Sequence, residues 1–96
     1  MRLLIDTEGK ISLEESDNFK SFSIVDKTNN TNRAALEAIA STEEDNHYWI
    51  DARSIIHLSN KGNESHWLDQ FWNMLKAVEP YGFSDMEKML VKAHVE

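Results

Sequence analysis

The first quarter of the chain shows the hydrophobic patterns of β-strands. Segments 10–14 and 21–25 alternate apolar and polar residues, and segment 2–6 is a short apolar run that ends at a turn around Gly9. Alternation with a period of two is typical of a strand that buries one face. We therefore predict three strands in these segments, joined by two hairpins, the second of which turns at the polar residues 15–18.

A different period follows in the middle of the chain. Leu36 and Ile39 lie three residues apart within an alanine-rich stretch, so the spacing predicts a helix over 32–45, although its acidic end is unfavourable for the helix dipole. Residues 47–50 are aromatic and β-branched, which predicts a fourth strand. Segment 52–58 fits either a short helix that begins after this strand or a continuation of the strand.

The last third is predicted to be helical. We expect a helix over 64–79, capped by Asn63, whose apolar residues gather on one side. Ser84 and Glu87 have the Ser-x-x-Glu spacing of a capping box, which predicts a final helix over 84–94. The apolar side of the first of these helices carries Trp67, Leu68, Phe71, Trp72, Met74, Leu75 and Val78.

These elements predict a single domain of the α+β class over residues 1–96. Strands 2–6 and 47–50 are apolar on both faces, so we place them next to each other in the middle of the sheet. With two hairpins and a right-handed crossover, the prediction is a small mixed sheet of four strands in the order 3-2-1-4. Three main helices pack on it, and the two longest helical segments are C-terminal.

Composition narrows the classes of function. The chain has 96 residues, 41% of them hydrophobic, and a formal net charge of −7. An acidic chain is a poor match for nucleic acid or anionic membranes, which attract clustered Lys and Arg. The chain has no Cys, no apolar run of bilayer length and no signal-peptide pattern near its start, so we expect no disulfide and a cytoplasmic location.

The C-terminal helical region has more apolar surface than a four-stranded sheet is expected to cover. Its apolar arc is wider than the ~100° stripe that a surface helix commonly buries. Two outcomes stay open at this point: all of it is core, or part of it faces another chain. We predict a protein–protein interaction or accessory module, either a homodimer or a subunit of a larger assembly, whose acidic surface favours a basic partner. The candidate interaction residues are Trp67, Phe71, Trp72, Met74, Tyr81 and Phe83.

A pocket is the alternative hypothesis. Asp51 and Arg53 follow the strand 47–50, and α/β proteins often place functional groups where a strand ends. With His57 and Trp49 they would form a small-molecule or enzymatic site, whereas the plainer interpretation is a helix cap at Asp51 and a surface arginine. The chain has no Gly-x-Ser-x-Gly elbow and no glycine-rich phosphate loop, so enzymatic activity and nucleotide cofactors are not expected.

A metal site is the second alternative. His66 and Asp69 lie three residues apart on the predicted helix 64–79, so they could share one ion with a ligand from elsewhere. The chain lacks the His-Glu-x-x-His and His-x-x-x-His spacings and has no Cys, so no metal or other cofactor is predicted. The plainer interpretation is an exposed His66 that bonds to Asp69 or to water.

Overall fold

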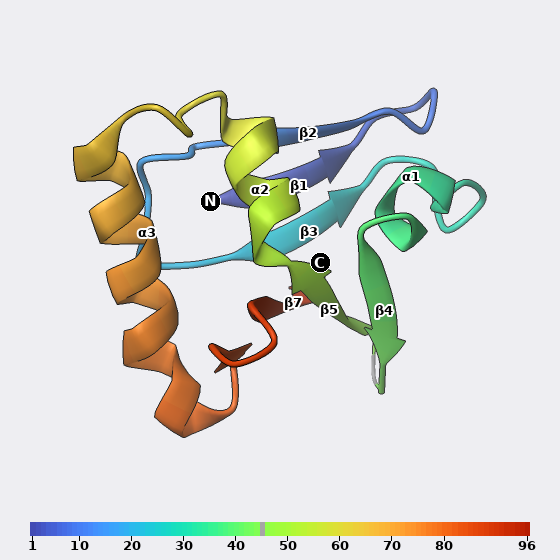
Figure 1. The fold of residues 1–96 in the computed structure, drawn as a ribbon. Helices are drawn as coiled ribbons and strands as arrows, with labels where there is room; N and C mark the ends of the chain where they lie inside the picture. Colours follow the sequence, from blue (N-terminus) through green and yellow to red (C-terminus); the bar gives the residue numbers. More distant parts are fainter. Residues whose placement is uncertain (45) are drawn as a thin grey trace.

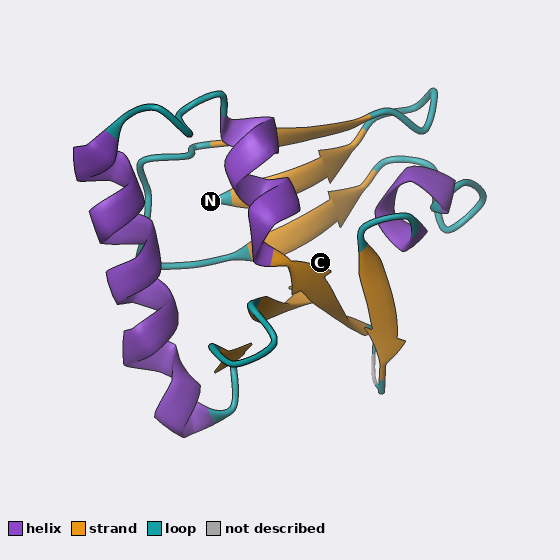
Figure 2. Cartoon of the chain, viewed as in Figure 1, coloured by secondary structure: helices purple, strands orange, loops and turns teal. Residues whose placement is uncertain are grey.

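A mixed β-sheet with helices packed against it organises the molecule, as Figure 1 and Figure 2 show. The fold is that of a computed structural model, which describes residues 1–44 and 46–96. The strands are β1 (Arg2–Ile5), β2 (Ile11–Glu14), β3 (Ser23–Asp26), β4 (Ala40–Glu43), β5 (His47–Asp51), β6 (Ser84–Asp85) and β7 (Leu90–Val95). The helices are α1 (Ala34–Glu37), α2 (Ala52–Ser59) and α3 (Ser65–Val78), and the 3₁₀ turn η1 (Glu79–Tyr81) follows α3.

The order of the strands is β2-β1-β3-β7-β5-β4, and β6 pairs with β7 beside this path. The predicted α+β class with a mixed sheet is confirmed, but the prediction of four strands in the order 3-2-1-4 is wrong. No hairpin joins β2 to β3 among the described residues, because β3 pairs in parallel with β1. β7 then lies between β3 and β5, so the strands that we placed side by side in the middle are separated.

The predicted helix over 32–45 is wrong beyond its first turn. α1 ends at Glu37, and residues from Ala40 onward form β4, which pairs antiparallel with β5. Within α1, Leu36 is the residue of the predicted apolar stripe that is fully buried. The β4–β5 ladder then satisfies the backbone groups that a longer helix would have paired internally. The end of the predicted helix, at Asp45, lies outside the described residues.

The predicted final helix over 84–94 is also wrong, since this segment forms β6, a turn and β7. Val91 and Ala93 are buried and alternate with Lys92 and His94, which is the period of a strand. The hydroxyl of Ser84 caps no new helix. It donates a hydrogen bond to the carbonyl of Leu75 near the end of α3.

Several predicted elements are confirmed. β1, β2, β3 and β5 lie within a residue or two of the predicted strands, and α3 matches the predicted helix over 64–79. Segment 52–58 is helical, as part of α2. Helix caps differ in detail, because Glu64 rather than Asn63 precedes α3, and the Asp51 carboxylate accepts a hydrogen bond from Ser54 Oγ instead of a backbone N–H.

One core lies between the helices and one face of the sheet, on the side where α2 crosses the strands in Figure 1. Alternation along the strands points one set of side chains into this core, for example Leu3, Ile24 and Ile50. Phe71 and Leu75 of α3 belong to the same buried cluster. The opposite face, here called the open face, carries the alternating set, which is partly or largely exposed. It includes Arg2, Leu4, Val25, His47, Trp49, Lys92 and His94.

A buried ion pair holds the connection between β3 and α1. Asp26 accepts a hydrogen bond from Arg33 Nε at 2.7 Å, and the two side chains are only 2% and 10% exposed. The same carboxylate accepts the backbone N–H groups of Thr28 and Asn30, and Arg33 Nη1 donates to Tyr48 Oη. Burial alone would raise the pKa of Asp26, but the hydrogen bonds from Thr28 and Arg33 outweigh it and lower the pKa to about 2.

Candidate functional site

An apolar groove of about 320 Å³ opens between α3 and the C-terminal strands. β3 and β6 pair with the same edge of β7, β3 at one end of this edge and β6 at the other. The segments that precede β3 and β6 approach the edge from two sides, and the groove opens between them. α3 forms the third side. The residues that line the groove are Phe19, Lys20, Ser21, Phe22, Met74, Val78, Phe83, Val91 and Lys92.

The aromatic rim is the name used here for Phe83, which lines the groove, and the exposed Tyr81 two residues earlier. Phe83 is 49% exposed and Tyr81, two residues earlier, is 77% exposed. The backbone fixes their position: Phe83 N donates to the carbonyl of Val78 at 3.2 Å, and Phe83 O accepts the N–H of Lys92 at 2.8 Å. Gly82 makes the turn between the two aromatics at φ +84°, a left-handed conformation that favours glycine.

The six aromatic and methionine residues predicted as an interaction surface divide between core and surface. Trp67 and Phe71 lie in the core with their rings stacked at 5.2 Å, and Trp67 Nε1 donates to the carbonyl of Ser16. These two side chains therefore offer no surface to a partner. Trp72 is partly buried against Phe71, whereas the other three residues line the groove or its rim: Met74, Tyr81 and Phe83.

Sequence reasoning missed the part of the groove that comes from the segment before β3. Phe19 and Phe22 flank Lys20 and Ser21 there. Phe22 was assigned to a strand and Phe19 to no feature. The available signal was the presence of two phenylalanines three residues apart in an otherwise polar connection. A loop rarely carries this much apolar area unless it packs on the core or forms a binding surface.

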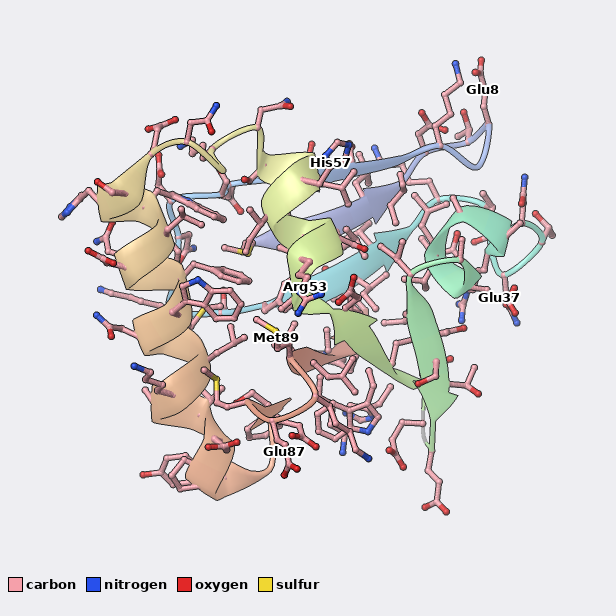
Figure 3. All side chains as sticks on the ribbon, viewed as in Figure 1. Glu8, Glu37, Arg53, His57, Glu87 and Met89 are labelled. Atoms are coloured by element: carbon pink, nitrogen blue, oxygen red, sulfur yellow. The ribbon has the colours of Figure 1, made fainter. Side chains whose placement is uncertain are left out.

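A second, smaller pocket of about 260 Å³ brings together three of the four residues of the alternative site. Asp51, Arg53 and His57 line it, with Ser54 and the apolar side chains of Ile11, Ile39 and Leu58. Trp49 does not, since it belongs to the open face of the sheet. Figure 3 shows Arg53 extended toward Met89, and the distance from Arg53 Nη2 to Met89 Sδ is 3.1 Å.

The hydrogen bonds of this smaller pocket do not follow the order of a catalytic triad. Ser54 Oγ donates to Asp51 at 2.9 Å, so the hydroxyl proton points to a carboxylate and not to an imidazole. A triad requires the serine to donate to a histidine that is in turn held by the acid. His57, one turn further along α2, is exposed.

The predicted metal pair stays on the surface of α3. His66 and Asp69 are both exposed. Within residues 1–44 and 46–96, no group of three or more His, Cys, Asp or Glu side chains is placed so that it could enclose a metal ion. In the same residues no helix is both long enough and apolar enough to cross a lipid bilayer.

No family model, curated protein or solved structure matches this chain.

Proposed function

We propose that the protein is an interaction module that pairs with a second copy of itself through the apolar groove and its aromatic rim, together called the docking surface. The observation that carries this proposal is the exposure of Tyr81 and Phe83 beside a groove whose walls are phenylalanine, methionine and valine side chains. Large apolar and aromatic side chains of this kind are enriched in the cores of protein interfaces.

The arrangement of the docking surface favours a second copy as the occupant. A two-fold interface needs a patch that is complementary to itself, with a protrusion and a matching hollow on the same face. Tyr81 is exposed and lies two residues before Phe83, which lines the groove. The volume of the groove is near the lower end of the range of ligand pockets, a size that suits one or two side chains. In a two-fold pair, each Tyr81 enters the groove of the other copy.

Charge on the docking surface is also complementary to itself. Lys20 and Lys92 line the groove. The ammonium of Lys92 lies over the Trp49 ring on the open face, so the charge that the groove offers is that of Lys20. Carboxylates accompany Tyr81: Glu79 belongs to the same 3₁₀ turn and accepts the N–H of Met86, the residue before Glu87. The net charge of −7 would favour a basic partner over the whole surface, but the local charge in the groove favours carboxylates such as those of a second copy.

The test is the molar mass in solution as a function of protein concentration, measured by sedimentation or light scattering. We expect a reversible dimer. Burying an aromatic side chain contributes on the order of 2 kcal/mol. A two-fold dimer loses two copies, so Tyr81→Ala should weaken association by about 4 kcal/mol, which is roughly 1,000-fold. Because Tyr81 is 77% exposed, its removal should leave the melting temperature of the monomer unchanged.

A charge reversal provides the matched control. Lys20→Glu places a carboxylate in the groove and should weaken the dimer, whereas Lys10→Glu makes the same change in charge at the β1–β2 turn and should not. A protein that remains monomeric at every concentration would overturn the proposal, even if it captured an unrelated protein. A dimer that tolerates both Tyr81→Ala and Lys20→Glu would show that it forms elsewhere and would overturn it equally.

The second pocket supports a second candidate function, the binding of a small polar ligand. The specific observation in its favour is that Asp51, Arg53 and His57 converge on one cavity. Mapping of amide shifts with a library of metabolites is the test, and shifts confined to residues 51–58 would support binding there. If no compound shifts these amides, the candidate is excluded for the compounds in the library.

A further inference from the structure

His47 and His94 lie directly opposite each other on neighbouring antiparallel strands, β5 and β7. The N–H of Val95 donates to the carbonyl of Asn46 at 2.9 Å, so residues 46 and 95 form a hydrogen-bonded pair of the ladder. The next pair along, His47 with His94, is therefore a non-hydrogen-bonded pair, in which side chains approach most closely. Their rings are 5.8 Å apart between centroids, with an interplanar angle of 41°.

One of the two imidazoles is already held in the orientation that metal ligands adopt. His47 Nδ1 lies 3.0 Å from the carbonyl oxygen of Glu44, an acceptor that only a protonated Nδ1 can satisfy. The proton is thereby placed on Nδ1, which leaves the lone pair of Nε2 free. A backbone carbonyl that fixes the tautomer in this way is the usual outer partner of a metal-bound histidine.

The surroundings of the pair on the open face include both signs of charge. Glu43 is the neighbour of His47 on β4, and Glu96 accepts a hydrogen bond from Ser23, which is the neighbour of His94 on β3. Trp49 Nε1 donates a hydrogen bond to Glu43, which holds this carboxylate on the open face.

The two basic side chains near the histidine pair, Lys92 and Arg2, each contact another side chain. The ammonium of Lys92 lies over the Trp49 ring, 5.7 Å from its centroid. Arg2, two strands from His94, is engaged by Glu14 at 3.4 Å and by Glu15 at 3.5 Å. Carboxylates therefore flank the two imidazoles, while the basic groups have partners of their own.

We infer that His47 and His94 form a two-histidine binding site for a borderline divalent transition-metal ion, of which Cu²⁺ and Zn²⁺ are the probes. Two imidazole nitrogens on one tetrahedral ion are about 3.3 Å apart, given metal–nitrogen distances near 2.05 Å. The ring centroids of His47 and His94 are 5.8 Å apart, a distance that one shared ion can span, and the His94 ring is exposed. Two protein ligands leave the other positions to water, and imidazole selects transition metals rather than Mg²⁺ or Ca²⁺.

The experiment titrates the full chain with Zn²⁺ by calorimetry, and with Cu²⁺ while amide signals are followed by NMR. We expect one ion per chain, Cu²⁺ bound more tightly than Zn²⁺ as in the usual order of affinities, and paramagnetic broadening centred on residues 47 and 94. His94→Ala and His47→Ala should each lower the affinity by at least the ~10-fold loss that follows removal of a second-shell partner. Zn²⁺ should raise the melting temperature of the wild type but not of these variants.

The chain offers a matched control in His66→Ala, which removes an exposed histidine from α3. This variant should leave the affinity unchanged. His94 is exposed, so His94→Ala decides the outcome even if His47→Ala fails to fold. Equal broadening at all four histidines, or a His94→Ala variant that binds as tightly as the wild type, would mean binding to single imidazoles and would overturn the inference.

Discussion

Replacement of Asp26 by Asn removes the negative charge of a buried ion pair and keeps the size of the side chain. Its carboxylate is 2% exposed and receives hydrogen bonds from Arg33, from the Thr28 hydroxyl and from two backbone N–H groups. Asn retains one acceptor oxygen but not the charge, so Arg33 stays nearly buried without its counter-ion.

The magnitude follows from the pKa of Asp26, which is lowered from 3.8 to about 2. At about 1.4 kcal/mol per pKa unit, the charged form stabilises the folded state by about 2 kcal/mol relative to the protonated form. Leaving one member of a buried pair alone costs about 3–5 kcal/mol in other proteins. We therefore expect Asp26→Asn to lower the free energy of unfolding at pH 7 by about 2–4 kcal/mol.

The dependence on pH gives a second and independent readout. Because the folded-state pKa lies below the unfolded value, the stabilisation is complete above about pH 5 and is lost as the pH falls through 3.8 toward about 2. Urea denaturation at a series of pH values measures this. The wild type should lose about 2 kcal/mol more than Asp26→Asn over this interval.

Asp6 is a close control, because it accepts the N–H groups of residues two and four positions ahead, Glu8 and Lys10, as Asp26 does with Thr28 and Asn30. The hydrogen bonds of Asp6 are exposed and no arginine pairs with it, so Asp6→Asn should cost only about 1 kcal/mol. If Asp26→Asn cost no more than Asp6→Asn and kept the pH dependence of the wild type, the ion pair would not be the source of the stabilisation.

Two further substitutions test the core and the end of α3. Phe71→Ala removes a fully buried ring that stacks on Trp67 and should cost about 3–5 kcal/mol in urea denaturation; a cost as small as that of Tyr81→Ala would contradict the assignment of Phe71 to the core. Ser84→Ala leaves the carbonyl of Leu75 without its hydroxyl donor in a buried position, and the melting curve should show a loss of about 1–3 kcal/mol. An unchanged melting temperature would mean that this hydrogen bond is not needed to join α3 to β6.

The docking surface shows how much of a site can be predicted from the helical spacing of apolar residues. The spacing of apolar residues on α3 predicts which residues share a side of the helix, but it ranks Phe71 and Met74 alike. Only the packed structure separates them, because Phe71 meets the sheet and Met74 reaches the groove. The other wall of the groove comes from Phe19 and Phe22, which no local pattern connects to α3.

The sequence alone determined the elements whose pattern is local and has one interpretation: β1, β2, β3, β5 and α3. It did not determine β7, because Met86, Met89, Leu90 and Ala93 have helical spacing while Val91, Ala93 and Val95 alternate as in a strand. The tertiary structure decided between them, since the backbone groups of β7 bond to β3 and β5, which come from distant parts of the chain, as well as to the neighbouring β6. The same long-range pairing set the order of the strands and brought His47 beside His94. Hydrogen bonds between strands, unlike those within a helix, can join residues that are far apart in the chain, so the pattern of one strand does not specify its partner.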